Sequence, residues 1–228
     1  MPTGPLAEAQ LAELRRWFNE YVRLFEQWRG DAPETRLPID LQLDGVRIHG
    51  HVGGVWGTGL GRIRPGEPGA GAQLRDGLDW LLANASGQPH ALVRFHDVGN
   101  GPERCERAPL DPAFARDALR ALLRLRRQGL NEPLPWGPYT GWTYYNEDRP
   151  DAALRKARER WEGGHDRWGE RDGEAFRLTL RGRDLFNDAA VFQRFEEVNT
   201  RIFRALVEGR AFDGFADDTA AGRSEATA

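Results

Sequence analysis

The sequence predicts one domain of the α/β or α+β class, in which helices flank a β-sheet. In several segments the apolar residues recur every three or four positions, which is typical of amphipathic helices. In other segments they alternate with polar residues, which is typical of half-buried strands. Both kinds of segment are interspersed along the 228 residues without an internal repeat or a clear linker. A chain of this length is sufficient for one large domain or two small ones.

The N-terminal part combines a helix with a hairpin. Residues 6–29 are expected to form an amphipathic helix with a broad aromatic face, which comprises Leu11, Leu14, Phe18, Tyr21, Val22, Phe25 and Trp28. Apolar and polar residues then alternate over 37–43, and Asp44-Gly45 supplies a two-residue hairpin turn. The return strand is expected to continue to Trp56, and the glycines after it indicate a bend into a third strand near 60–63.

Helical patterns dominate the rest of the chain. The elements expected there are a helix at 73–86, a strand at 90–98, a loop that contains Cys105, a helix at 111–128, a charged helix at 151–162, a strand pair or irregular stretch at 174–186, a helix at 189–208 and a disordered tail at 213–228. The helix at 111–128 has the clearest boundaries. Asp111 is its expected N-cap, Pro112 occupies the first helical position, and Gly129 lies past its end.

Residues 129–145, GLNEPLPWGPYTGWTYY, combine helix-breaking residues with five large aromatic side chains. Central strands exclude proline, and solvated linkers lack aromatic residues. The prolines fix their own φ and bias the residues before them, so we expect an extended strip. Trp136, Tyr139 and Trp142 are therefore candidate interface residues. Three alternatives stay open for them: packing on the domain itself, contact with another subunit, and stacking on DNA bases.

A row of arginines follows one face of the predicted helix at 111–128. Its members, at spacings of four, four and three, are Arg116, Arg120, Arg124 and Arg127. Neighbouring arginines repel each other, so such a row needs acidic partners or anions. The row is interpreted as a solvated face with scattered carboxylate partners, as a track for nucleic-acid phosphates, or as a protein interface.

Other kinds of site find little support in the sequence. His49 and His51 share one strand face, but no metal-ligating motif accompanies them, so neither a metal nor a cofactor is expected. The sole lysine, Lys156, lies in no phosphate-binding loop, which argues against ATP hydrolysis.

No apolar run approaches the roughly 20 residues needed to cross a membrane. The single cysteine, Cys105, suits a reducing cytoplasm. The net charge of -3 excludes a globally basic DNA-coating protein but permits a local basic face.

An ordered set of motifs resembles the C-terminal domain of RecC, the gamma subunit of exodeoxyribonuclease V, the RecBCD helicase-nuclease. The motifs ALLRLRRQGLNEPLPWGPYTGWTYY, ALRKARERWEGG and GERDGEAFRLTLRGRDLF follow one another within residues 119–186. Upstream, LQLDGVRIHGHVGG and LRDGLDWLLA fit the same domain more loosely, so the resemblance extends over 37–208. The resemblance rests on the order of these motifs along the chain.

The resemblance implies a fold similar to the PD-(D/E)xK nucleases, with a mixed sheet flanked by helices. An active member of that class holds Mg²⁺ with an aspartate on one strand and an acid on the next, beside a lysine that supports the attacking water. Here Gly53 stands at the aspartate position, and Arg94 and His96 stand for the acid and the lysine. Asp97 is one residue out of phase and would point to the other face. The resemblance therefore implies that the catalytic residues are lost.

The resemblance also implies an organisation and a role. Residues 1–30 would be an N-terminal amphipathic helix, 31–212 the nuclease-like domain, and 213–228 a disordered tail. The expected role is a non-catalytic scaffold that assembles with other RecBCD subunits in the cytoplasm and guides forked or single-stranded DNA during double-strand break repair. One rival hypothesis is a stand-alone interaction module without a DNA role. The other is an active metal-dependent nuclease with ligands such as Asp40, Asp44, Glu170 and Asp172.

Overall fold

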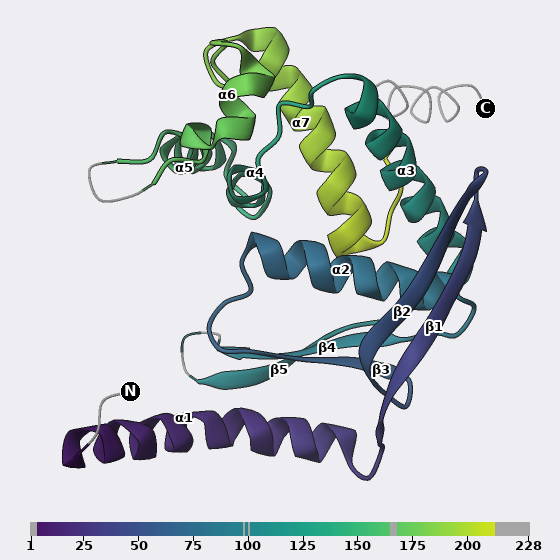
Figure 1. The fold of residues 1–228 in the computed structure, drawn as a ribbon, viewed down its shortest axis with the longest axis vertical. Helices are drawn as coiled ribbons and strands as arrows, with labels where there is room; N and C mark the ends of the chain where they lie inside the picture. Colours follow the sequence, from purple (N-terminus) through teal and green to yellow (C-terminus); the bar gives the residue numbers. More distant parts are fainter. Residues whose placement is uncertain (1–3, 98, 100, 165–167, 213–228) are drawn as a thin grey trace, which may run out of the picture.

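The structure, a computed structural model, describes residues 4–97, 99, 101–164 and 168–212. In chain order its elements are α1 (Pro5–Arg29), β1 (Glu34–Leu43), β2 (Val46–Trp56), β3 (Gly59–Arg64), α2 (Ala70–Ala85), β4 (Ala91–Asp97), β5 (Pro102–Arg107), α3 (Pro112–Asn131), α4 (Pro138–Tyr145), α5 (Pro150–Glu162), the 3₁₀ turn η1 (Glu170–Asp172), α6 (Glu174–Leu180), α7 (Ala189–Phe203) and the π turn η2 (Arg204–Glu208) (Figure 1). The expected mixture of helices and strands is therefore confirmed.

The five strands form one mixed sheet in the order β1-β2-β3-β4-β5. The pairs β1–β2, β2–β3 and β4–β5 are antiparallel, whereas β3 and β4 are parallel because α2 crosses over between them. Asp44 and Gly45 both have positive φ at the tip of the long β1–β2 hairpin, as the predicted two-residue turn requires. This hairpin rises from the rest of the sheet to the side of α3 (Figure 1). The prediction of a mixed sheet flanked by helices is confirmed.

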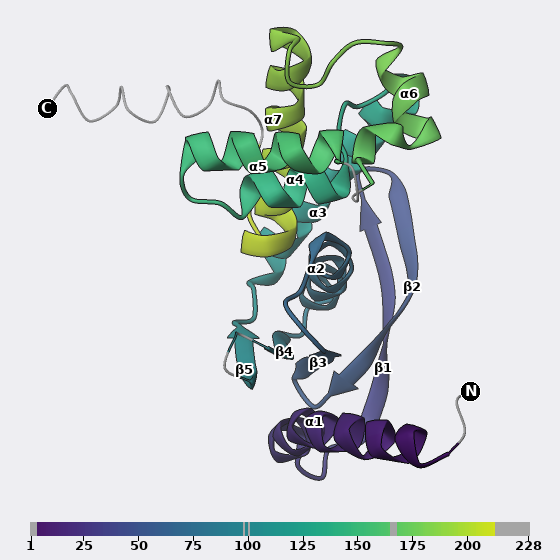
Figure 2. The ribbon, with the colours of Figure 1, turned by 90° about the vertical axis from the view of Figure 1, so that its left-hand side faces the viewer.

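Helix α1 packs on one face of the sheet, and α2 packs on the opposite face (Figure 2). Only the C-terminal half of α1 makes this contact. There, Tyr21 is fully buried, and Trp28 and Phe25 contact the ring of Phe95 on β4. Glycine at position 61 permits the close approach of the helix, because a Cβ there would lie 2.6 Å from the Trp28 ring. The C-terminal half of α1 thus shares a hydrophobic core with the sheet.

The larger core lies between the sheet and the helices behind it. Trp80 and Leu81 of α2 are buried against Leu60 of β3 and Leu92 of β4. Helices α3 and α7 then pack on the far side of α2, away from β3, β4 and β5 (Figures 1 and 2). A third cluster, around Trp161, joins α5 to α6 and α7. The chain therefore stacks in layers, with α1, the sheet, α2 and the remaining helices following one another.

One expected loop and one expected helix boundary are wrong. Cys105 does not lie in a loop but in the edge strand β5, which pairs with β4. Its neighbours are charged, so this strand carries no apolar alternation that sequence reasoning could detect. Gly129 lies inside α3, which continues to Asn131. The helix ends where Glu132 becomes extended, because the α conformation is disfavoured before a proline.

Two helices lie where other conformations were expected. The strip at 129–145 is extended only in its first part, because α4 begins at Pro138. Proline is compatible with the first turn of a helix, where its missing N–H would have no partner. Helix α6 occupies part of 174–186, where a strand pair or irregular stretch was expected. On this short helix Leu178 is 76% exposed. The tail at 213–228 lies outside the described residues.

Candidate functional site

The face of the sheet that α2 covers carries a cluster of charged side chains. Arg62 and Arg64 of β3 lie beside Arg94 and His96 of the parallel neighbour β4, because these residues are paired in register. The period of two along each strand places all four side chains on the same face. We call Arg62, Arg64 and Arg94 the arginine cluster. Its side chains point at α2 rather than at solvent.

Asp76 of α2 is the centre of this cluster and is fully buried. Its Oδ1 lies 2.6 Å from Arg64 Nη2 and 3.6 Å from Arg62 Nε, and its Oδ2 accepts a hydrogen bond of 3.1 Å from Arg94 Nε. Arg62 also pairs with Asp79 at 2.8 Å. Two carboxylates therefore face three guanidinium groups, and the local charge is positive.

Further polar contacts fix the arginines in place. Arg94 Nη1 donates to Gln73 Oε1 at 2.9 Å. Arg62 Nη2 donates to the carbonyl of Gly53 on β2 at 3.2 Å. Burial lowers the pKa of Arg94, and the charge of Asp76 opposes this change. These contacts join three strands to α2, although Arg64 Nε and Arg94 Nη2 are buried without a hydrogen-bond partner in the described residues.

A fourth arginine extends this positive region. Arg107 of β5 lies over the ring of Trp80, with its guanidinium carbon 4.9 Å from the ring centroid. It also donates to the carbonyl of Leu206 at 2.7 Å. Burial lowers the pKa of Arg107 to about 10, and the nearby charge of Arg94 acts in the same direction. The guanidinium group stays protonated at neutral pH.

Sequence reasoning named Arg94 and His96 but missed the rest of this cluster. A signal was present, because Arg62 and Arg64 alternate with Gly61 and Ile63 on a short strand. On α2, Gln73 and Asp76 follow a helical spacing of three on a buried face that is largely apolar. Charged residues on the inner faces of two elements must meet partners, since unpaired buried charges are very costly.

The arginine row of α3 is largely engaged within the chain. Arg116 donates to the carbonyl of Ala85 at 3.0 Å, at the end of α2. Arg120 pairs with Asp117 at 2.6 Å and with Asp44 at 3.4 Å. The row thereby holds the tip of the β1–β2 hairpin against α3.

The other two members of the row lie nearby. Arg127 donates to the carbonyl of Asp44 at 2.5 Å. Arg124 is exposed and lines a hollow of about 210 Å³ together with Gln128 and Arg201. Arg116, Arg120 and Arg127 therefore have partners within the chain, and the three interpretations of the row stay predictions.

The aromatic segment turns mainly toward α7. Trp136 Nε1 donates to Asn199 Oδ1 at 2.8 Å, and its ring contacts Phe203. Trp142 also packs on Phe203, with ring centroids 5.3 Å apart. Tyr139 is 47% exposed, with the guanidinium of Arg160 over its ring. The structure therefore separates two inward tryptophans from one outward tyrosine.

The four acids of the alternative nuclease hypothesis do not meet. Each has another partner: Asp40 pairs with Arg47, Asp44 with Arg120, Asp172 with Arg171, and Glu170 accepts from the backbone N–H groups of Tyr139 and Thr140. Glu170 is almost fully buried, and its carboxylate takes the place of a capping residue at the start of α4. Within the described part of the chain, no group of three or more His, Cys, Asp or Glu could hold a metal ion.

The fold and this cluster define a mixed α/β domain whose charged sheet face is closed by internal ion pairs. Residues 1–149 match the family of the RecC C-terminal domain. The match covers more than half of the 228 residues, so the chain belongs to this family, and the predicted resemblance is confirmed. It includes α1 and overlaps the motif segment over 119–149. No curated protein matches the chain. None of the described helices is long and apolar enough to span a bilayer.

Proposed function

We propose that the chain is a non-catalytic, nuclease-like scaffold domain of the RecC subunit of the cytoplasmic RecBCD helicase-nuclease. In this role it supports subunit assembly and the guidance of forked or single-stranded DNA during double-strand break repair. Membership in the RecC C-terminal domain family supports the link to this complex and to DNA repair. The observation that carries the non-catalytic part is the pairing of Asp76 with three arginines.

The order of elements supports the comparison with PD-(D/E)xK nucleases. It also changes which strand is compared with the strand that carries the acid and the lysine. The strand that follows and pairs with β2 is β3, not β4. The acid and lysine expected on the next strand then correspond to Arg62 and Arg64 rather than to Arg94 and His96. With either strand, arginine replaces the acid. At the aspartate position, Gly53 supplies only a carbonyl, which accepts a hydrogen bond from Arg62.

The electrostatics of the cluster oppose metal binding. A divalent cation beside Asp76 would meet three guanidinium groups, and like charges at such distances repel strongly in a buried site. Asp76 has no open lone-pair direction toward solvent, because its side chain is completely buried. Asp79, 29% exposed, is already bound to Arg62. The guanidinium groups thus neutralise the carboxylates that a metal would need.

The assembly part of the proposal is supported by the N-terminal half of α1. Residues 8–20 are all exposed, although they belong to one continuous helix. The exposed apolar side chains on this segment include Leu11, Leu14, Trp17 and Phe18. An isolated helix of this length is only marginally stable in water, and a contiguous apolar patch marks an interaction surface. A partner that covers this stripe would stabilise both the helix and the complex.

Assembly with the two motor subunits tests this proposal. Leu14→Gln and Phe18→Gln together should weaken association of the chain with the motor subunits at least tenfold, as expected for central apolar contacts. Glu13→Gln on the same exposed helix is the matched control and should have no effect. Co-sedimentation and thermal melting would be measured for each variant. Full association of the double variant, or no association of the wild-type chain, would overturn the assembly role.

A further inference from the structure

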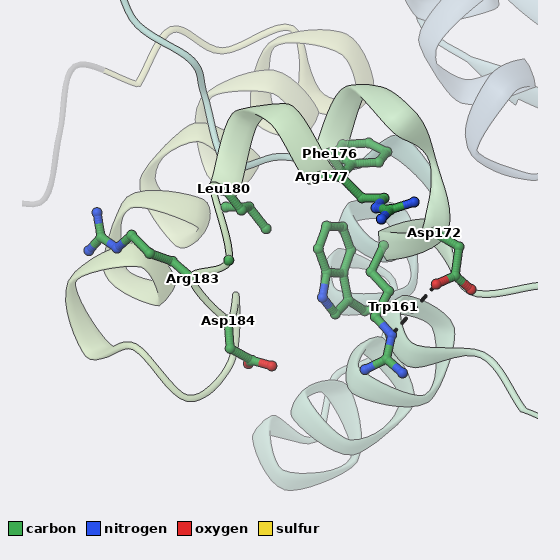
Figure 3. Close-up of a pocket in the computed structure, with 9 residues that line it drawn as sticks. Trp161, Asp172, Phe176, Arg177, Leu180, Arg183 and Asp184 are labelled. Carbon is green, nitrogen blue, oxygen red and sulfur yellow. Dashed lines mark ion pairs between the residues drawn. The ribbon is translucent and has the colours of Figure 1, made fainter.

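A pocket of about 550 Å³ lies between α5, η1, α6 and the loop that follows α6 (Figure 3). Its apolar wall is made by Trp161, Phe176 and Leu180. Trp161 and Phe176 meet edge to face, with ring centroids 5.2 Å apart. Neither the arginine cluster nor the arginine row contributes to this pocket, so it is separate from the sites described above.

Three hydrogen-bond donors around this pocket are only weakly engaged within the described residues. Trp161 is 3% exposed, yet its indole Nε1 has no hydrogen-bond partner there. This nitrogen lies on the side of the ring that faces Asp184 across the pocket (Figure 3). Arg171 contacts only its neighbour Asp172, at 3.9 Å, and Arg177 has no ion pair or side-chain hydrogen bond in the described part of the chain. An indole N–H and two guanidinium groups favour an anion.

The other charged residues of the pocket are already used. Arg183 turns away and pairs with Asp188 at 2.8 Å. Asp184 Oδ1 accepts hydrogen bonds of 2.9 Å from the backbone N–H groups of Phe186 and Asn187. These contacts hold the loop in place and leave Arg171, Arg177 and Trp161 as the groups available to a ligand.

The lining favours a carboxylate on an apolar segment over a nucleic acid. A nucleic-acid site needs a track of cations for successive phosphates. Here Asp172 and Asp184 interrupt the arginines and would repel a polyanion. Trp161 is only 3% exposed and meets Phe176 edge to face, so it offers little open surface on which a base could stack. A single carboxylate beside an aliphatic or aromatic side chain matches both the donors and the apolar wall.

We propose that this pocket binds a segment of a protein partner that carries Asp or Glu next to a large apolar residue. The carboxylate would accept from Arg171, Arg177 and Trp161 Nε1, and the apolar side chain would lie against Phe176 and Leu180. Because the pocket would be a docking site between proteins, this inference rests on the proposed role in assembly. The pocket is a different surface from the exposed half of α1.

Selection of random heptapeptides displayed on phage, with the whole chain as bait, tests this inference. Enriched peptides should share an acid beside Leu, Phe or Trp. Each selected peptide should bind the Arg171→Gln/Arg177→Gln variant roughly ten- to a hundredfold more weakly, since bonds to charged groups are lost. Arg155→Gln, on an exposed part of α5, is the matched control and should bind normally. Replacing the acid of the peptide by its amide should weaken binding to the same extent as the double variant.

Several outcomes would overturn the inference. These are a selection without enrichment, enriched peptides without an acid, and binding that the double variant does not change. Binding of a single-stranded oligonucleotide that is lost in the double variant would assign the pocket to nucleic acid instead. Melting of each variant separates loss of binding from loss of fold. If the peptides bind as expected while the chain fails to associate with the motor subunits, the assembly proposal is wrong. The assignment of the pocket as a peptide-binding site is then still supported.

Discussion

Replacing Asp76 by asparagine should destabilise the fold strongly while changing almost no volume. The carboxylate is completely buried and lies within 3.6 Å of three guanidinium groups. Without it, three arginines would share the single charge of Asp79. Removal of one partner from a buried ion pair costs about 3–5 kcal/mol, because the remaining charges stay desolvated and uncompensated. For a domain of this size, that loss corresponds to a melting temperature roughly 6–20 °C lower.

The matched control is Asp79→Asn, which removes a carboxylate from the same helix. Its side chain is 29% exposed and has one arginine partner, so we expect a loss of about 1 kcal/mol or less. Urea unfolding followed by circular dichroism would give both free energies. Combining Asp76→Asn with Arg64→Gln should recover part of the loss, because one uncompensated charge is removed. Equal effects of Asp76→Asn and Asp79→Asn, or no recovery in the combined variant, would refute the reasoning.

Three other predictions concern the aromatic segment, the pH dependence and the hairpin. Trp136→Ala should cost about 3–5 kcal/mol in urea unfolding, and Tyr139→Ala under about 1 kcal/mol; similar losses would contradict the inward and outward placement. Burial and the charge of Arg94 lower the pKa of His96 below 6.5, so its stability contribution is present above that pH and lost below it. Between about pH 7 and about pH 5, the melting temperature of His96→Gln should therefore fall less than that of the wild type. Arg127→Ala should speed amide exchange at the hairpin tip while lowering stability by under about 1 kcal/mol, and unchanged exchange would disprove the anchoring role.

Local patterns predicted most of the fold. The helical spacing from Leu11 to Trp28 and the turn at Asp44-Gly45 both correspond to observed elements. The errors arose where local patterns are weak or ambiguous. Strand β5 is charged and owes its conformation to pairing with β4. Helix α4 begins at a proline and is capped by Glu170, which is distant in sequence. No local sequence pattern therefore indicates where this helix begins.

The site was less predictable than the fold. The arginine row was visible as a pattern, but its partners, such as the carbonyl of Ala85, depend on tertiary contacts. The arginine cluster draws on β3, β4 and α2, and its members become neighbours only through the parallel crossover. Sequence reasoning compared Arg94 and His96 of β4 with the catalytic acid and lysine, and this comparison stays a prediction. Only the pairing of β2 with β3 shows which strand comes next.

Metal-dependent DNA cleavage by the purified chain is the most direct test of the central claim. Single-stranded and forked DNA would be incubated with the chain and Mg²⁺ or Mn²⁺ across a range of salt concentrations. The paired carboxylates and the arginine cluster predict no cleavage above that of a mock purification. Cleavage that co-elutes with the chain through successive columns, and that disappears in Asp40→Asn or Asp172→Asn, would contradict the account and establish an active nuclease.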